Sequence, residues 1–314
     1  MSRRLTVALA SACLLTVLPA ADTVATSVYS RVSRDYKRER LKEGSFKPEY
    51  YALANGGRIA GTTSDVTVER ITYAEVAEIS MRLLAQQNYR YAQSKEQADL
   101  LLTLQWGSTI APNGVNYDQS VAQAGKALSE LRGLSNQAGP VIKPLADPMI
   151  EGESGVAGYA KAKFEMAMLK LFAENQARDW INEHNARILG YMDDLAAAND
   201  IRRWAGGGDR YSDLITDVEE SRYFIVISAY DFRELTERKE KKLLWQTRVS
   251  VRSPGNRFDE SFVPMLRGAS KYFGQDSGRL VKGEEPKGLV ELGDLKFLGE
   301  AKEPGSEKTN ENNK

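Results

Sequence analysis

The residues best suited to chemistry are two pairs of adjacent carboxylates, Asp193-Asp194 and Glu219-Glu220. Two carboxylates on either side of a glycosidic bond are the usual machinery of glycoside hydrolysis. Adjacent residues on a helix point about 100° apart, so neither pair converges through local geometry alone. We expect ordinary solvated acids at these positions, and a carbohydrate-active hydrolase that uses a pair of carboxylates is the alternative function.

His184 is the only histidine and Cys13 is the only cysteine. This composition excludes zinc sites built from several histidines or cysteines, and a serine–histidine–aspartate triad would need His184 as its base. His184 lies on the apolar seam of an expected helix, where a structural hydrogen bond is the simpler role. The glycine-rich stretch 152–163 lacks the residue order of a phosphate-binding loop and follows no expected strand. We predict no catalytic, cofactor-binding or metal-ligating residue.

Tryptophan side chains offer another kind of site, because a tryptophan buried at an interface contributes much of the binding energy. Trp106 and Trp245 fall on apolar faces of expected strands, which assigns them to the core. Trp180 and Trp204 lie in an expected helical insertion and are the candidates for a contact surface. Packing within the chain is nevertheless the simpler expectation for both.

The first 21 residues have the pattern of a cleavable signal peptide. Two arginines precede an apolar run over 5–18, and the small residues of 18–21 offer a cleavage site. Lipid attachment at Cys13 is not expected, because Ala10 stands where a branched apolar residue is required and the apolar run continues past the cysteine. We expect an exported protein, either periplasmic or extracellular.

The charge balance argues against a dedicated nucleic-acid-binding protein. The chain has 43 Lys and Arg against 43 Asp and Glu, whereas nucleic-acid binders carry a strong basic excess. Loss of the signal peptide would remove two arginines and leave a net charge of about −2. The exported chain would then contain no cysteine, so its stability would depend on its core. No second apolar run reaches the length of about 18 residues that a transmembrane helix needs.

One helix and one strand give the clearest signals. Thr72 and Glu75 can form a capping box, with Ile71 and Val76 as a hydrophobic staple, and this pattern predicts a helix over 72–88. The strand is predicted over 100–106, where the core face would carry Leu100, Leu102, Leu104 and Trp106. Further strands are predicted at 222–232, 243–251 and 289–298, and a further helix at 261–273, with Pro264 tolerated only in its first turn.

Residues 112–220 are predicted to be a helical insertion, with one helical piece near 118–134 and one long helix or two over 159–204. An apolar seam at the spacing of a coiled coil runs through Ala177, Ile181, His184, Ile188, Tyr191 and Leu195. This seam could pair with a copy of itself, but its short length makes packing within the chain the safer assumption.

These elements define the expected organisation. Residues 1–21 form the signal peptide, 22–46 a polar charged segment, 47–111 with 221–299 a single discontinuous α+β domain, 112–220 the helical insertion, and 300–314 a disordered tail. The fold class is α+β, with helices packed on a mixed or antiparallel sheet of about four to five strands.

Three short features resemble known families. Ala98-Asp99 opens one strand, Asp231 ends another, and Leu244-Trp245 opens a third. This layout is similar to the small α+β domain of penicillin-binding-protein activator lipoproteins and of the curli secretion lipoprotein. The resemblance covers about 70–111 and 221–275, and it implies binding to partners in the cell envelope rather than catalysis.

The expected function is therefore that of a secreted, non-catalytic envelope or extracellular protein. It would act as a scaffold or protein-binding module with its contact surface on the helical insertion. An envelope protein is the expected partner, and self-association through the insertion helix is the other interaction we consider.

Overall fold

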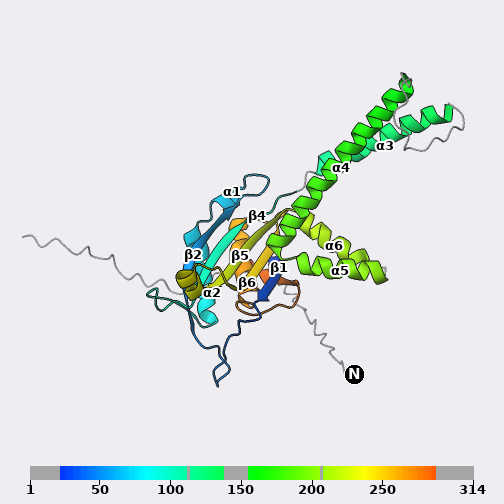
Figure 1. Cartoon of the computed structure of the whole chain (residues 1–314). Helices are drawn as coiled ribbons and strands as arrows, with labels where there is room; N and C mark the ends of the chain where they lie inside the picture. The colour runs from blue at the N-terminus through cyan, green and yellow to red at the C-terminus, as the bar shows by residue number, and fades with distance from the viewer. Residues whose placement is uncertain (1–21, 112–113, 138–154, 206–207, 288–314) are drawn as a thin grey trace, which may run out of the picture.

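The computed structural model describes residues 22–111, 114–137, 155–205 and 208–287, which form a mixed sheet with helices on both faces (Figure 1). The strands are β1 (Thr23–Val32), β2 (Glu49–Ile59), β3 (Tyr89–Tyr91), β4 (Leu100–Ser108), β5 (Arg222–Asp231), β6 (Leu243–Arg252) and β7 (Val281–Pro286). The helices are α1 (Val66–Glu69), α2 (Tyr73–Gln86), α3 (Gly114–Gln137), α4 (Val156–Leu189), α5 (Met192–Ala205), α6 (Gly208–Glu219) and α7 (Phe258–Ser270), with a π-helix η1 (Glu234–Arg238).

The strand order is β3-β2-β4-β5-β6-β1-β7. β2 is parallel to β3 and β4, and every other neighbouring pair is antiparallel. The α+β class and the mixed sheet are confirmed. The predicted strand number is wrong, because the described residues form a sheet of seven strands.

β1 corrects the interpretation of residues 22–46 as a polar segment outside the domain. This strand lies between β6 and β7 and pairs antiparallel with both. Its polar residues Thr26 and Ser30 are buried, and the Ser30 hydroxyl lies 2.7 Å from the Thr247 hydroxyl and donates to the Tyr272 carbonyl at 3.0 Å. Because these hydroxyls find partners inside the protein, a polar-looking segment forms an inner strand.

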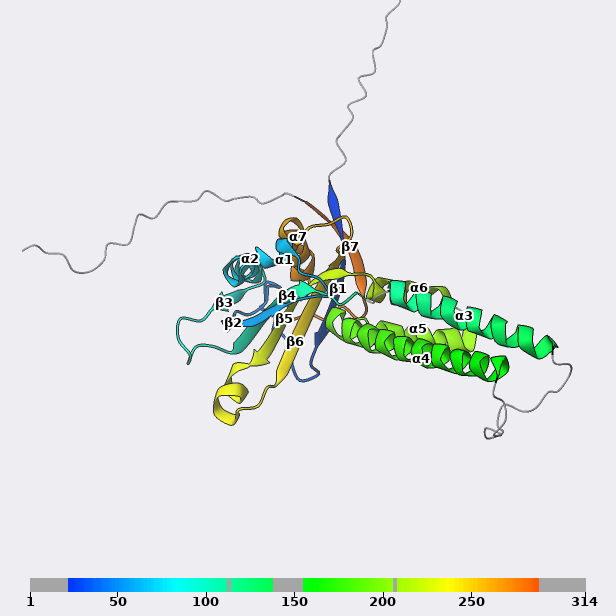
Figure 2. The same cartoon turned by 90° about the horizontal axis from the view of Figure 1, so that it is seen from above.

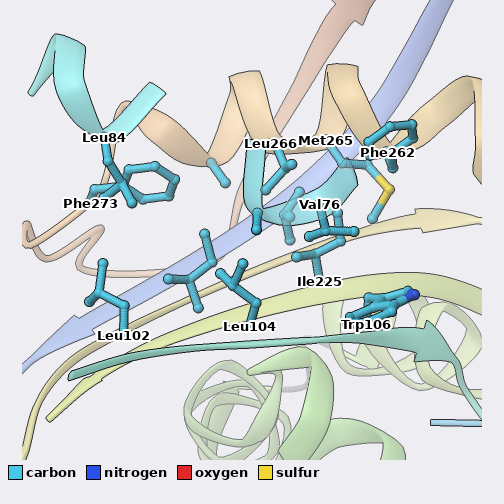
Figure 3. Packing of buried hydrophobic residues seen from close by; sticks show 14 of the residues in the cluster. Val76, Leu84, Leu102, Leu104, Trp106, Ile225, Phe262, Met265, Leu266 and Phe273 are labelled. Carbon is cyan, nitrogen blue, oxygen red and sulfur yellow. The ribbon is translucent and has the colours of Figure 1, made fainter. Parts of the chain in front are cut away.

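α2 and α7 cover one face of the sheet over the main hydrophobic core (Figure 3). The prediction for 100–106 is confirmed, since Leu100, Leu102, Leu104 and Trp106 are all buried on this face. The capping box of α2 is also confirmed. The Thr72 hydroxyl accepts from the Glu75 amide, and the Glu75 carboxylate accepts from the Thr72 amide.

α7 begins at Phe258, three residues before the predicted start, so Pro264 lies inside the helix instead of in its first turn. Proline has no amide hydrogen and cannot donate to the carbonyl one turn earlier. Buried contacts of Phe262, Met265 and Leu266 with the sheet compensate for this loss. The helix predicted here is confirmed, but its first residue was predicted too late in the sequence.

The second face of the sheet carries the helices of the insertion. The end of α4 packs with α5 and α6 against Phe224 and Val226 of β5. From this base α3 and the first part of α4 project away from the sheet as a two-helix hairpin (Figures 1 and 2). We call α3 together with α4 as far as Ile181 the hairpin.

The helices α3 to α6 lie in the sequence between β4 and β5, and these two strands pair directly in the sheet. The long helical stretch 159–204 is two helices, because Gly190 ends α4 with a left-handed backbone (φ +82°). The predicted strand at 289–298, the signal peptide and the tail lie outside the described residues.

Candidate functional site

Small side chains of α3 form its contact with α4 in the hairpin. Ala124 and Ala127 are nearly fully buried where α3 packs along α4, and Ala160 of α4 is buried in return. Lys163 of α4 donates to Glu130 of α3 at 2.7 Å. Short side chains allow the two helices to approach closely, so α3 covers one side of α4 and leaves the other side open.

The open side of α4 carries an exposed stripe that is apolar except for Gln176. We define the α4 stripe as Tyr159, Ala162, Met166, Leu169, Ala173, Gln176 and Trp180, all of which are exposed. These residues recur at alternating spacings of three and four, which is the heptad pattern of a coiled-coil seam. The four largest remain mostly in water, with exposed fractions of 73% for Tyr159, 71% for Met166, 69% for Leu169 and 62% for Trp180.

Charges flank the α4 stripe asymmetrically. Lys163 and Lys170 lie along one edge, and Glu165 and Asp179 lie along the other. All four are positions that adjoin a heptad seam, where charges set partner choice and orientation. The stripe therefore has the two features of a helix-pairing surface, an apolar line and a charge pattern beside it.

A buried asparagine anchors α4 to the sheet domain. The Asn185 amide group donates to the Ile110 carbonyl at 2.7 Å and to the Val218 carbonyl at 3.2 Å, and its oxygen accepts from the Ile110 amide at 3.2 Å. The side chain is fully buried. These bonds join the end of α4 to the segment after β4 and to α6, so the hairpin is fixed at its base.

Arg178 and Glu219 form a second brace between α4 and α6. Two parallel hydrogen bonds of 2.6 Å join the guanidinium to the carboxylate, and Asn182 adds a third donor at 2.8 Å. Burial alone would raise the pKa of Glu219, but the hydrogen bonds from Arg178 and Asn182 outweigh it and hold the pKa below its ordinary value of 4.5. Glu219 is thus charged, whereas a glycosidase acid needs a raised pKa.

The other acids of the two sequence pairs are also bound to cations. Asp193 accepts from Arg31 and Tyr29, and Asp194 accepts from Arg210 at 2.6 Å and from the Leu280 amide at 2.9 Å. Glu220 forms an ion pair with Arg252. Each acid serves as a bridge between elements, and the geometry of the four acids gives no support to the hydrolase alternative.

The remaining predicted residues have mixed outcomes. His184 stacks on Trp180 with ring centroids 5.6 Å apart, so a ring contact takes the place of the expected hydrogen bond. Trp180 is exposed, contrary to the expectation of packing within the chain. The side chain of Trp204 lies outside the described residues, whereas Trp106 and Trp245 are core residues as predicted.

The predicted seam and the exposed stripe are different faces. Tyr191 of the seam is fully buried, and Ile188 and Leu195 pack on the same cluster, so the seam faces its own domain. The exposed face begins earlier in α4 and was missed. Apolar residues surround α4 on all sides in this part of the sequence, and periodicity alone does not tell which side α3 covers.

Two cavities open at the edges of the sheet domain. One of about 300 Å³ is lined mainly by hydroxyl groups, and in it Tyr223 donates to Asp65 at 2.6 Å. The second, of about 270 Å³, contains Arg222 and Lys282, which both bind Asp217. In each cavity a carboxylate, Asp65 or Asp217, is already bound to neighbouring side chains of the lining, which is the pattern of structural hydrogen bonding.

A buried polar cluster beside β2 was also missed by sequence reasoning. Burial raises the pKa of Glu49, although Tyr36 donates to its carboxylate at 2.7 Å and Arg38 lies 3.2 Å from it. The Arg38 guanidinium also lies over the rings of Phe46 and Tyr89 at 4.2 and 3.9 Å from their centroids. These contacts fasten the segment between β1 and β2 to the core.

The residues that carry the family resemblance have structural partners. The Asp99 carboxylate accepts from the Tyr50 amide, and Asp231 accepts from the amides of Arg233 and Glu234 where β5 ends. Trp245 is fully buried against Phe273. No family model matches the chain, and the search of curated proteins found no significant match.

Within the described ranges, no three histidine, cysteine or acidic side chains gather as a metal site requires. Among the same residues, no helix combines the length and apolar character needed to cross a bilayer. The α4 stripe is therefore the strongest candidate functional surface in the part of the chain that the structure describes.

Proposed function

We propose that this chain is an exported, non-catalytic binding module whose sheet domain holds the hairpin as a contact surface for protein. The observation that carries the proposal is the exposed α4 stripe. Burial of apolar area gains roughly 25 cal/mol per Å², and exposed apolar patches of this kind mark interaction sites. The sheet domain contributes the rigid base through Asn185 and the Arg178–Glu219 brace.

Export is proposed on the signal-like pattern of residues 1–21, and an envelope or extracellular location follows from it. The charge balance supports a protein partner over a nucleic acid. The asymmetric charges beside the stripe support a partner with a defined orientation, because such charges select register.

Site-specific crosslinking in cells tests the proposal. A photo-crosslinking amino acid replaces Met166 on the stripe or Met168, which is also exposed but faces another side of α4. The proposal predicts discrete crosslinked protein bands from position 166 and far weaker bands from position 168. Mass spectrometry then identifies the captured chain. Equal capture at both positions, or none at 166, would remove the hairpin as a contact surface.

A further inference from the structure

We infer that the occupant of the α4 stripe is the same stripe of a second copy of this chain, in parallel orientation. This inference rests on the proposed function and names the partner of that surface. Three features of α4 support it: the heptad positions of the exposed residues, the sides on which the flanking charges lie, and the area that the stripe leaves in water.

The heptad positions favour a helix of the same kind as partner. Tyr159, Met166, Ala173 and Trp180 occupy one seam position, and Ala162, Leu169 and Gln176 occupy the other. In a parallel pair each seam residue meets its own copy. Large residues then meet large ones at both ends of the stripe, and the Gln176 amides face each other. A single polar layer of this kind fixes register in paired helices.

The charges decide the orientation. In a parallel pair, the edge that carries Glu165 lies beside the partner's edge that carries Lys170. In an antiparallel pair, each edge meets its own copy, so the edge with Lys163 and Lys170 would place lysine against lysine. Lys163 is already bound to Glu130, whereas among the described residues Lys170 donates only to the neutral Gln123 side-chain oxygen at 3.3 Å, which leaves its charge available to a carboxylate. The parallel arrangement is therefore the complementary one.

The exposed area suits a modest dimer. An aromatic side chain carries about 150–250 Å², so Tyr159 and Trp180 at 73% and 62% exposed offer on the order of 250 Å² together. Met166 and Leu169 add to this along a stripe about 32 Å long. Specific dimers bury about 800 Å² on each partner and weak ones less, so we expect reversible association.

Light scattering and sedimentation on purified residues 22–314 test the inference with a matched pair of variants. Wild type should shift from one-chain to two-chain mass as concentration rises. Met166→Glu buries a charge in the seam and should weaken association at least about tenfold. Met168→Glu introduces the same charge outside the seam and should leave association unchanged. One-chain mass for wild type at the highest soluble concentration, or equal loss in both variants, would overturn the inference.

Cysteine crosslinking tests the orientation, because residues 22–314 contain no native cysteine. A disulfide needs Cα atoms about 4.4–6.8 Å apart. A parallel pair predicts that Ala162→Cys and Ala173→Cys each form disulfide dimers alone, whereas Ala157→Cys, an exposed control on another face, does not. An antiparallel pair would bring position 162 against position 173, so dimers only in a mixture of the two variants would overturn the parallel arrangement.

The in-cell experiment separates the two levels of the proposal. Capture of a second copy from position 166 supports both. Capture of a different protein only, together with one-chain mass in solution, retains the binding module and removes the dimer. Absence of any capture removes the binding module itself.

Discussion

Replacement of Asn185 by alanine tests how firmly the hairpin is attached to the sheet domain. The side chain makes three hydrogen bonds to the backbone of Ile110 and Val218 and is fully buried. A typical buried hydrogen bond contributes about 1 kcal/mol net, so Asn185→Ala should lower the free energy of unfolding by about 3 kcal/mol. The two carbonyls and the one amide left behind would each lose a hydrogen-bond partner.

Urea unfolding followed by tryptophan fluorescence measures this loss, and the slope of the transition should stay constant. Asn182→Ala is the matched control, because Asn182 donates one hydrogen bond of 2.8 Å to Glu219 at a half-buried position. The control should lose about 1 kcal/mol. Equal losses in the two variants would refute the assignment of Asn185 as the anchor of α4.

Three further substitutions test other parts of the structure. Glu219→Gln should destabilise the protein at neutral pH. Because the pKa of Glu219 in the folded protein lies below its ordinary 4.5, the stabilisation by its charge is fully present above pH 4.5 and is lost as the pH falls through the folded pKa. The difference between wild type and variant in urea melts should therefore shrink in acid, and a pH-independent difference would contradict the brace. A left-handed backbone costs an alanine about 1–2 kcal/mol of stability. Gly190→Ala should lose more than this, because its Cβ would lie 2.6 Å from Tyr29, whereas Gly255→Ala has open space and should lose only the cost of the left-handed backbone. Equal shifts of the melting temperature in the two variants would contradict the packing at Gly190. Leu102→Ala should lose about 2–5 kcal/mol as a fully buried core residue, and a loss under about 1 kcal/mol would show that the core facing α2 and α7 is misplaced.

The sequence predicted those elements whose signals are local. Thr72 and Glu75 specify a helix start through a reciprocal pair of hydrogen bonds, and the alternation of Leu100, Leu102 and Leu104 specifies which face of β4 is buried. The same reasoning missed β1. Its burial depends on hydroxyl partners such as Thr247 and Tyr272, which are distant in sequence.

The candidate surface could be predicted only in outline. The sequence placed a contact surface on the helical insertion and named Trp180 as a candidate, and the structure leaves that side chain exposed. It selected the seam through Ile188 and Tyr191, which faces the domain, instead of the α4 stripe. The choice depends on which side of α4 receives α3, and that is a tertiary contact with no local signal.

Methionine oxidation in intact cells tests most directly the claim that the α4 stripe is a contact surface. In the isolated chain, diluted until it is monomeric, Met166 is 71% exposed and Met168 is 42% exposed, so peroxide should convert Met166 to sulfoxide faster. If the stripe is covered by protein in the cell, Met166 is protected and Met168 reacts first. Fragment mass spectrometry of the peptide that holds both residues gives the two rates. Faster oxidation of Met166 in cells, as in the isolated chain, would contradict the account.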